Sequence, residues 1–358
     1  MIVEETLYAD RFRLIRQIGC GGSSEVWLAE DIELAEEVAL KFPSWDLSQT
    51  HLELLKRETR QARQLSHRHI LRTYDLILPH EDRAAISLEY APGGSLIDLM
   101  MKQKRCFEPS EIEPWIEQTC EALMYLHSEK GLVHRDLKPG NLFLGGDGKI
   151  RLGDFGISAF LELQMDDATR KTLDNRLTLH FASPQQIADP TESRPDNDIY
   201  SLGVTVFNLL TGSFPFKDPL ANRWPWDPGN LISMNQTRQR RGHGEPSIAQ
   251  RWEYAVAKCL AENPGDRPGS ARDFAGLIRL ESPVALTPLP AAGFPLHSAE
   301  TEQPTLHAAK RRPWRRLGLV VLIILSTVLT GVAAGLTWGL LVSNSASDVP
   351  KTAGEASE

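Results

Sequence analysis

Two short polar runs in the middle of the chain constrain its fold and chemistry more than any other feature. The first is His-Arg-Asp-Leu-Lys-Pro-Gly-Asn at residues 134–141, and the second is Asp-Phe-Gly at residues 154–156. Together they supply a carboxylate, an amine, an amide and a second carboxylate. Phosphoryl transfer needs such a set: a group that orients a hydroxyl, a cation for the γ-phosphate and oxygen ligands for Mg²⁺. Few other chemistries require it.

The two runs resemble the catalytic and metal loops of eukaryotic-type (Hanks-type) serine/threonine protein kinases, H-R-D-L-x-x-x-N followed by D-F-G. Gly19, Gly21 and Val26 also match the glycine-rich loop G-x-G-x-x-G-x-V, with Ser24 where the third glycine would stand. Residues 38–41, Val-Ala-Leu-Lys, match the V-A-I-K strand. The resemblance covers about residues 11–280 and implies an α+β, bilobal kinase fold with a small β-rich N-lobe and a larger helical C-lobe.

The resemblance assigns a role to individual residues. Asp136 is expected to orient the hydroxyl and accept its proton, Lys138 to neutralise the γ-phosphate, and Thr178 to touch the catalytic aspartate. Asn141 and Asp154 are expected to hold Mg²⁺, with Mn²⁺ as the alternative. The implied ATP-binding set consists of Ile18, Gly19, Gly21, Gly22, Val26, Ala39, Lys41, Glu58, Leu88, Glu89, Ala91 and Phe143.

Hydrophobic periodicity places several of these residues on elements. Residues 11–42 alternate as strands around the glycine cluster, and residues 52–65 have helical spacing, so Glu58 is expected to reach Lys41 from a helix. Residues 84–91 form an apolar strand that ends at Pro92. The resemblance to kinases implies that Leu88 is the gatekeeper residue and that the backbone of Glu89 and Ala91 hydrogen-bonds adenine.

The second half of the chain contains further matches to the kinase pattern. Residues 110–113, Ser-Glu-Ile-Glu, have the form of a capping box, and the apolar positions after them predict a helix toward Gly131. The resemblance implies that Asp198 lies at the start of a helix and holds the backbone of the catalytic loop. Thr211-Gly212 is expected to end this helix. Gln185 replaces the usual glutamate, so we expect a neutral hydrogen bond to Arg267 where the family has an ion pair.

Regulation by phosphorylation is one of two alternatives that the residues leave open. Arg135 precedes Asp136, an arrangement typical of kinases that a phosphate in the activation segment switches on. Thr169 and Thr172 are the candidate acceptors. Asp174 lies near the position of that phosphate in some relatives, which would instead give constitutive activity.

An uncharged stretch of 26 residues, 317–342, predicts one C-terminal transmembrane helix. Five basic residues precede it, so the positive-inside rule places residues 1–316 in the cytoplasm of a single-pass cell-membrane protein and favours contact with anionic lipid. The predicted organisation is an N-terminal lead (1–10), the kinase domain (11–280), a flexible linker (281–309), a basic juxtamembrane segment (310–316), the span (317–342) and an extracytoplasmic tail (343–358).

The remaining expectations concern partners. Gly331, Gly335 and Gly339 recur every four residues and favour a homodimer within the membrane. The net charge of −8 argues against nucleic-acid binding, and four scattered cysteines suit a reducing compartment. The predicted function is phosphorylation of Ser and Thr on proteins, including the chain itself. The alternatives are a catalytically weak or inactive nucleotide-binding scaffold and, less favoured, a small-molecule phosphotransferase.

Overall fold

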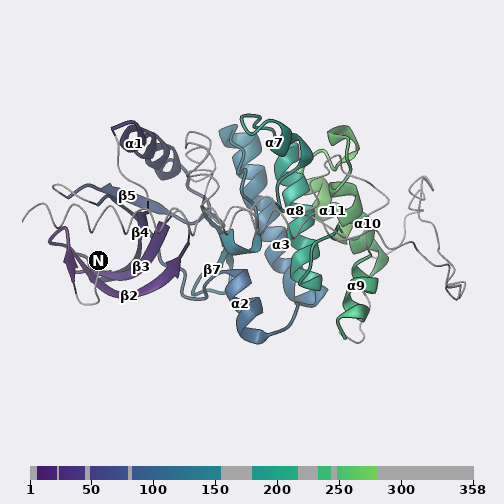
Figure 1. Cartoon of the computed structure of the whole chain (residues 1–358), viewed down its shortest axis with the longest axis horizontal. Helices are drawn as coiled ribbons and strands as arrows, with labels where there is room; N and C mark the ends of the chain where they lie inside the picture. The colour runs from purple at the N-terminus through teal and green to yellow at the C-terminus, as the bar shows by residue number, and fades with distance from the viewer. Residues whose placement is uncertain are drawn as a thin grey trace, which may run out of the picture. The chain divides into compact units, whose positions relative to one another are not determined.

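The described residues of this computed structural model are 6–21, 24–44, 49–79, 83–154, 180–216, 233–242 and 248–279. They lie in the first of two compact units, Met1–Phe294. Within this unit an antiparallel sheet with one helix is followed by a helical part (Figure 1). The bilobal kinase architecture expected from the sequence is therefore confirmed for these residues.

Six strands make the N-terminal sheet in the order β1-β2-β3-β4-β6-β5. Alternating side chains of β2, β3 and β4 meet on one face, where Phe12, Leu40 and Phe42 are fully buried, as the period of two in their sequences requires. The strands are β1 (Leu7–Tyr8), β2 (Phe12–Cys20), β3 (Ser24–Asp31), β4 (Glu36–Pro43), β5 (Thr73–Ile77) and β6 (Ala85–Glu89).

Helix α1 (Gln49–Arg63) packs on the sheet beside β5. Its fully buried Leu55 contacts Ala84 and Ile86 at β6, which fixes the face of α1 that turns toward the sheet. Glu58 lies one turn further along this helix. Thr59 hydrogen-bonds the Leu55 carbonyl at 2.8 Å, so its hydroxyl is satisfied inside the helix.

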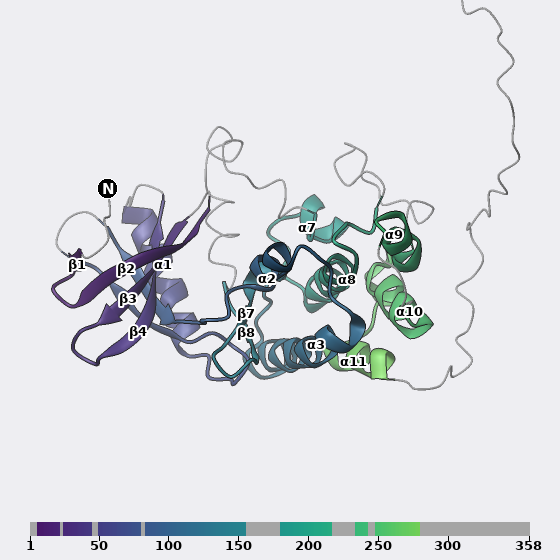
Figure 2. The same cartoon turned by 90° about the horizontal axis from the view of Figure 1, so that it is seen from below.

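The helical part is built around α8 (Pro195–Thr211), whose residues from Asn197 onward are all buried. It contacts α3, α9 and α10, and Figure 2 shows it among these helices. Gly212, at φ 62°, ends α8, as the sequence predicted. The other elements are α2 (Leu96–Gln103), α3 (Pro109–Met124), β7 (Leu142–Leu144), β8 (Ile150–Leu152), α7 (Pro184–Ala188), α9 (Met234–Arg240), α10 (Gln250–Cys259) and α11 (Ala271–Arg279).

Helix α3 begins at a different residue from the one that the sequence predicted. It begins at Pro109, and the capping box is formed by Glu108 and Glu111, so the box predicted at residues 110–113 is wrong by two positions. Proline fits the first helical position because it has no N–H to satisfy, which sets the start. At its other end α3 passes directly into a π-helical turn, Tyr125–Lys130, that ends at Gly131.

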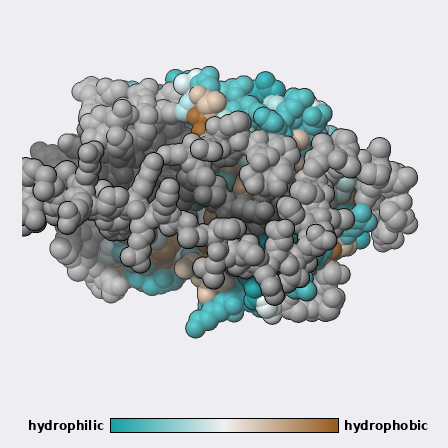
Figure 3. All heavy atoms as spheres, turned by 45° about the vertical axis from the view of Figure 1, so that its right-hand side comes forward, coloured by the Kyte–Doolittle hydropathy of each residue, from teal (hydrophilic) through white to brown (hydrophobic). Residues whose placement is uncertain are grey.

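Apolar side chains from the helices and from the β7–β8 hairpin form one large core. On the face seen in Figure 3 the described residues that reach the surface are mostly hydrophilic. Among the described residues no helix is long and apolar enough to cross a membrane. Residues 281–358, with the predicted linker, basic segment and span, lie outside the described ranges.

Candidate active site

Residues 134–141 form a loop between the π-helical turn and β7, and Asp136 is its centre. Lys138 Nζ lies 2.9 Å from Asp136 Oδ2, and Asn141 Nδ2 lies 2.9 Å from the same oxygen. Asn141 Nδ2 also donates to the Asp136 carbonyl at 2.7 Å. Within the described residues Asp136 Oδ1 is buried and has no hydrogen-bond partner. One carboxylate oxygen is thus held in place, while the other is available to accept a proton.

The backbone of this loop is held by Asp198 in the first turn of α8. The fully buried Asp198 carboxylate accepts hydrogen bonds from the N–H of His134 at 2.7 Å and of Arg135 at 2.8 Å. The positive end of the helix dipole favours a carboxylate at this position. The role that the sequence implied for Asp198 is confirmed.

A residue that sequence reasoning missed completes this arrangement. His127 Nε2, on the π-helical turn, lies 2.7 Å from Asp198 Oδ2, and its side chain is 7% exposed. The available signal was a histidine at the end of an apolar helix, seven residues before His134. Asp198 therefore links three groups: the π-helical turn and two consecutive peptide N–H groups of the loop.

The pairing of β7 with β8 brings the two polar runs together. Leu142 lies opposite Leu152, and the Gly153 N–H donates to the Asn141 carbonyl at 3.0 Å. Asp154 follows directly, so Asn141 and Asp154 stand at the same end of a short hairpin. An amide oxygen and a carboxylate are ligands that Mg²⁺ accepts, and the donor set fits the predicted metal role.

Lys41 on β4 contacts Asp154 across the two lobes. Its Nζ lies 2.5 Å from Asp154 Oδ1. Burial would raise the pKa of Asp154, but the charge of Lys41 and its hydrogen bond outweigh that effect and lower the pKa. Asp154 adopts a left-handed backbone, at φ 55°.

Glu58 is not paired with Lys41 in this structure, contrary to the expectation from the sequence. Its Oε2 is buried and has no hydrogen-bond partner within the described residues. Because burial removes water without supplying a partner, the pKa of Glu58 rises to about 8, although the charges of Arg57, Lys41 and Arg135 oppose the shift. The physical reason is competition: one buried ammonium meets two carboxylates, and Asp154 is the one within bonding distance.

Strand pairing in the N-terminal sheet positions many of the predicted nucleotide-binding residues. Gly19 lies opposite Val26 across the β2–β3 hairpin, and the Gly21 N–H donates to the Ser24 carbonyl at 2.9 Å. On the next strand Lys41 lies opposite Val26. Pairing also sets Ala39 opposite Leu88 on β6. The glycine hairpin and the strand that carries Lys41 are thus where the sequence predicted them.

Comparison with known proteins identifies this arrangement. The sequence model of the protein kinase domain matches residues 12–275. The chain belongs to the protein kinase family. The kinase PrkC of Bacillus subtilis, a serine/threonine-protein kinase by name, is 31% identical over 271 residues, which are 75% of this chain and 40% of that protein.

Two further relatives support the family and the fold. PknB of Mycobacterium leprae, also named a serine/threonine-protein kinase, is 30% identical over 290 residues, 76% of this chain and 43% of that protein. The kinase chain thus spans less than half the length of these two relatives. The crystal structure of the Mycobacterium tuberculosis PknI kinase domain matches with a TM-score of 0.59 at 23% identity, over 78% of this chain and 98% of that one. This last likeness concerns the fold alone.

The connection between the lobes of the kinase passes through Glu89. Its backbone N–H donates to the Arg72 carbonyl at 2.9 Å, while its carboxylate accepts from the Arg72 N–H at 3.2 Å and from Arg151 Nε at 3.1 Å. The Ala91 carbonyl accepts from the Gly94 N–H at 3.1 Å. The sequence did not reveal the side-chain role of Glu89.

Phe143 on β7 packs closely against Gly153. A Cβ added to Gly153 would lie 3.0 Å from the Phe143 ring.

The end of the activation segment, around Gln185, is anchored as predicted. Arg267 Nη2 donates to Gln185 Oε1 at 2.7 Å, and Gln185 Nε2 donates to the Glu262 carbonyl at 2.9 Å. Arg267 is buried and also bonds the carbonyls of Ala261 and Asp196. The hydrogen bond expected between the uncharged Gln185 amide and Arg267, in place of an ion pair, is confirmed.

Several predicted residues lie outside the described ranges. They are Gly22 of the glycine-rich loop, Thr178, the candidate phosphoacceptors Thr169 and Thr172, Asp174, and the glycines Gly331, Gly335 and Gly339. Their roles stay predictions.

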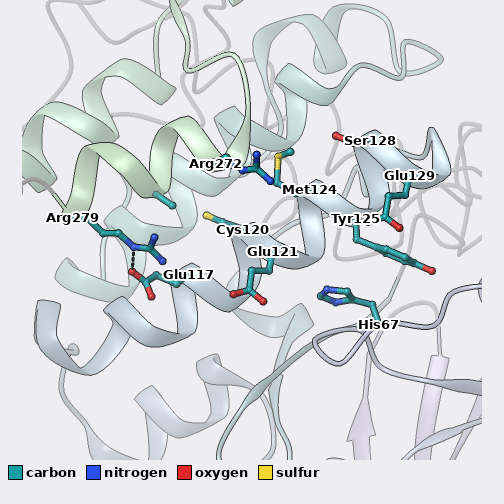
Figure 4. A pocket seen from close by; sticks show the side chains of 11 residues that line it. His67, Glu117, Cys120, Glu121, Met124, Tyr125, Ser128, Glu129, Arg272 and Arg279 are labelled. Atoms are coloured by element: carbon teal, nitrogen blue, oxygen red, sulfur yellow. Dashed lines mark hydrogen bonds and ion pairs between the residues drawn. The ribbon is translucent and has the colours of Figure 1, made fainter.

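A pocket of about 370 Å³, shown in Figure 4, has none of the phosphotransfer residues among its lining residues. Its walls come from α3, the π-helical turn, α11 and His67, which stacks on Tyr125 with ring centroids 5.0 Å apart. Two glutamates at the pocket are already paired, Glu117 with Arg279 and Glu121 with Arg68. The two glutamates lie one turn apart on α3. Their ion pairs connect this helix to α11 through Arg279 and to the loop after α1 through Arg68.

Proposed function

We propose that the chain is a membrane-anchored serine/threonine protein kinase that transfers the γ-phosphate of ATP to Ser and Thr hydroxyls of proteins, its own included. The observation that carries the proposal is the state of Asp136. Its Oδ2 is held by Lys138 and Asn141, and its buried Oδ1 has no partner within the described residues. A substrate hydroxyl at Oδ1 would be oriented for in-line attack and would have an acceptor for its proton.

The other residues of the site would position the phosphates. Lys138 neutralises the γ-phosphate, and Lys41 binds the α- and β-phosphates once its contact with Asp154 is exchanged for them. Asn141 and Asp154 would hold the divalent cation, Mg²⁺ or alternatively Mn²⁺, which neutralises charge on the phosphate oxygens. The backbone of Glu89 and Ala91 would bind adenine between Ala39, Leu88 and Phe143.

Selectivity for Ser and Thr rests on Lys138, two places after Asp136, which is the pattern of serine/threonine kinases. Autophosphorylation of Thr169 or Thr172 would place a dianionic phosphate within reach of Arg135. The names of the bacterial relatives support the same class of activity.

The proposed membrane anchor is residues 317–342, with the basic residues before them facing anionic lipid on the cytoplasmic side. Pairing through Gly331, Gly335 and Gly339 would bring two kinase domains together and favour phosphorylation of one by the other. Loss of association after Gly335→Ile, measured by energy transfer in vesicles, supports this pairing, and unchanged association rejects it.

The decisive experiment measures phosphate incorporation from ATP into a general protein substrate and into the chain itself. Asp136→Asn removes the proton acceptor and is expected to abolish nearly all incorporation. Equal incorporation by Asp136→Asn and the unmodified protein would refute the mechanism. An unmodified protein that binds ATP without any turnover would instead establish the inactive scaffold.

A further inference from the structure

Arg135, directly before the catalytic aspartate, has a backbone conformation that does not persist without support. Its φ is 70°, in the left-handed region that side-chain-bearing residues avoid. The peptide between Arg135 and Asp136 takes its orientation from this conformation. Whatever holds Arg135 therefore also sets the direction in which the Asp136 carboxylate points.

Three contacts within the described residues hold Arg135. Its N–H is bound by Asp198, 2.8 Å from Oδ1, and its guanidinium donates to the Pro190 carbonyl. Its carbonyl oxygen accepts a hydrogen bond from Gln186 Nε2 at 2.8 Å. Gln186 therefore holds the carbonyl group of the peptide that joins Arg135 to Asp136.

Gln186 is itself held in place by the start of α7. Its N–H donates to the hydroxyl of Ser183, the N-cap of this helix, at 3.1 Å. The Ser183 hydroxyl in turn donates to Asn197 Oδ1 on α8 at 2.7 Å, and both residues are buried. The neighbouring Gln185 is tied to Arg267. The amide of Gln186 is therefore delivered to the catalytic loop by an ordered network.

We infer that Gln186 is a positioning residue for phosphotransfer, which couples the end of the activation segment to the catalytic aspartate through the carbonyl of Arg135. The inference rests on the proposed kinase activity and adds a residue to it. Within the described residues no hydrogen bond joins Gln186 to the Asp136 side chain or to the nucleotide residues. Loss of Gln186 is expected to lower kcat, while the KM for ATP stays within about twofold because Lys41 and the backbone of Glu89 and Ala91 are untouched.

The test compares two substitutions in the full-length protein. Gln186→Met keeps the length of the side chain and removes the donor. Gln186→Glu keeps the shape but directs a carboxylate at a carbonyl oxygen, unless the carboxyl is protonated. Loss of this partly buried hydrogen bond predicts a fall in kcat of roughly 10-fold for Gln186→Met at every pH.

The pH profile separates positioning from a general loss of structure. For Gln186→Glu the ratio of its kcat to that of the unmodified protein is expected to rise as pH falls from 8 to 5.5, because the protonated carboxyl regains a donor. The ratio for Gln186→Met stays flat. Thr191→Ala is the control, since it removes a hydrogen bond to Asp189 in the same loop without contacting the catalytic loop, and its kcat is expected to match the unmodified protein.

The outcomes are distinct. A kcat within twofold of the unmodified protein for both Gln186 variants overturns the inference, as does a loss shared equally by Thr191→Ala. Variants that melt below the assay temperature also overturn it, because Gln186 would then be required for folding. If the unmodified protein shows no turnover, the proposed function fails instead, and the assay reports that separately.

Discussion

Lys41 pairs with Asp154 at 2.5 Å, whereas Oε2 of Glu58, the carboxylate expected to brace Lys41, is buried and has no hydrogen-bond partner within the described residues. The carboxylates of Asp154 and Glu58 therefore compete for the single ammonium group of Lys41. A phosphate or a metal ion at Asp154 would release Lys41 toward Glu58. Among the described residues, this exchange of partners is one difference between the present arrangement and the one implied for catalysis.

The raised pKa of Glu58 makes stability depend on pH in a defined direction. The pKa is about 8 in the folded chain against the ordinary value of 4.5, so the folded state binds more protons between these values. The free energy of unfolding is therefore highest below about pH 4.5 as far as Glu58 is concerned, and this contribution is lost as pH rises toward 8. The upper bound of this contribution is roughly 5 kcal/mol, and the residue's partial exposure to solvent reduces it.

Glu58→Gln is expected to remove this slope, because the amide cannot ionise. Urea unfolding at pH 5.5 and 8.5 would show a smaller difference for Glu58→Gln than for the unmodified protein. Glu53→Gln serves as the control, since Glu53 is exposed and paired with Lys56 on the same helix. An identical pH dependence in Glu58→Gln and the unmodified protein would contradict the assignment.

His127→Ala is expected to weaken both the fold and catalysis. The substitution takes away one of three hydrogen bonds from a fully buried carboxylate, and roughly 1–3 kcal/mol of unfolding free energy should be lost. The N–H groups of His134 and Arg135 lose part of their anchor, so kcat should fall as well. Thermal unfolding and steady-state kinetics measure the two effects. Ser128→Ala, an exposed neighbour on the same turn, should change neither, and equal effects from both substitutions would argue against a specific role for His127.

Gln185 makes one hydrogen bond that a glutamate at this position could not make. Its amide oxygen accepts from Arg267 and its amide nitrogen donates to the Glu262 carbonyl, a bond that a carboxylate cannot make. Gln185→Glu should therefore turn the bond to Arg267 into an ion pair and lose the donor to Glu262, with a net change below about 1 kcal/mol. Gln185→Leu loses both bonds and should cost roughly 1–3 kcal/mol. Chemical denaturation compares the two variants, and a large stabilisation by glutamate would show that the Glu262 contact is unimportant.

The sequence predicted those parts of the kinase domain whose cause is local. The glycine hairpin, the strand of Lys41 and the end of α8 at Gly212 follow from turn chemistry and periodicity, and all are found. The hydrogen bond between Gln185 and Arg267 also follows, because a family pattern names both partners.

What the sequence did not predict depends on competition or on irregular geometry. A period of 3.6 residues cannot anticipate a π-helical turn, so His127 was not expected at Asp198. The choice of Lys41 between Glu58 and Asp154 depends on distances of a few ångströms in space. The bond from Gln186 to the Arg135 carbonyl joins residues 51 apart and leaves no mark on periodicity.

Two helical glycines provide a matched pair of substitutions with opposite expected signs. A Cβ added to Gly203, in the centre of α8, would lie 2.5 Å from the Cβ of Cys259 on α10, whereas nothing lies within 4 Å of a Cβ added to Gly276 on α11. Gly203→Ala must push α8 and α10 apart and should cost roughly 1–3 kcal/mol. Gly276→Ala only reduces the freedom of the unfolded chain and should gain roughly 0.5–1 kcal/mol. Denaturant unfolding of both variants checks the signs, and a neutral Gly203→Ala would show that the two helices do not approach as closely as the structure places them.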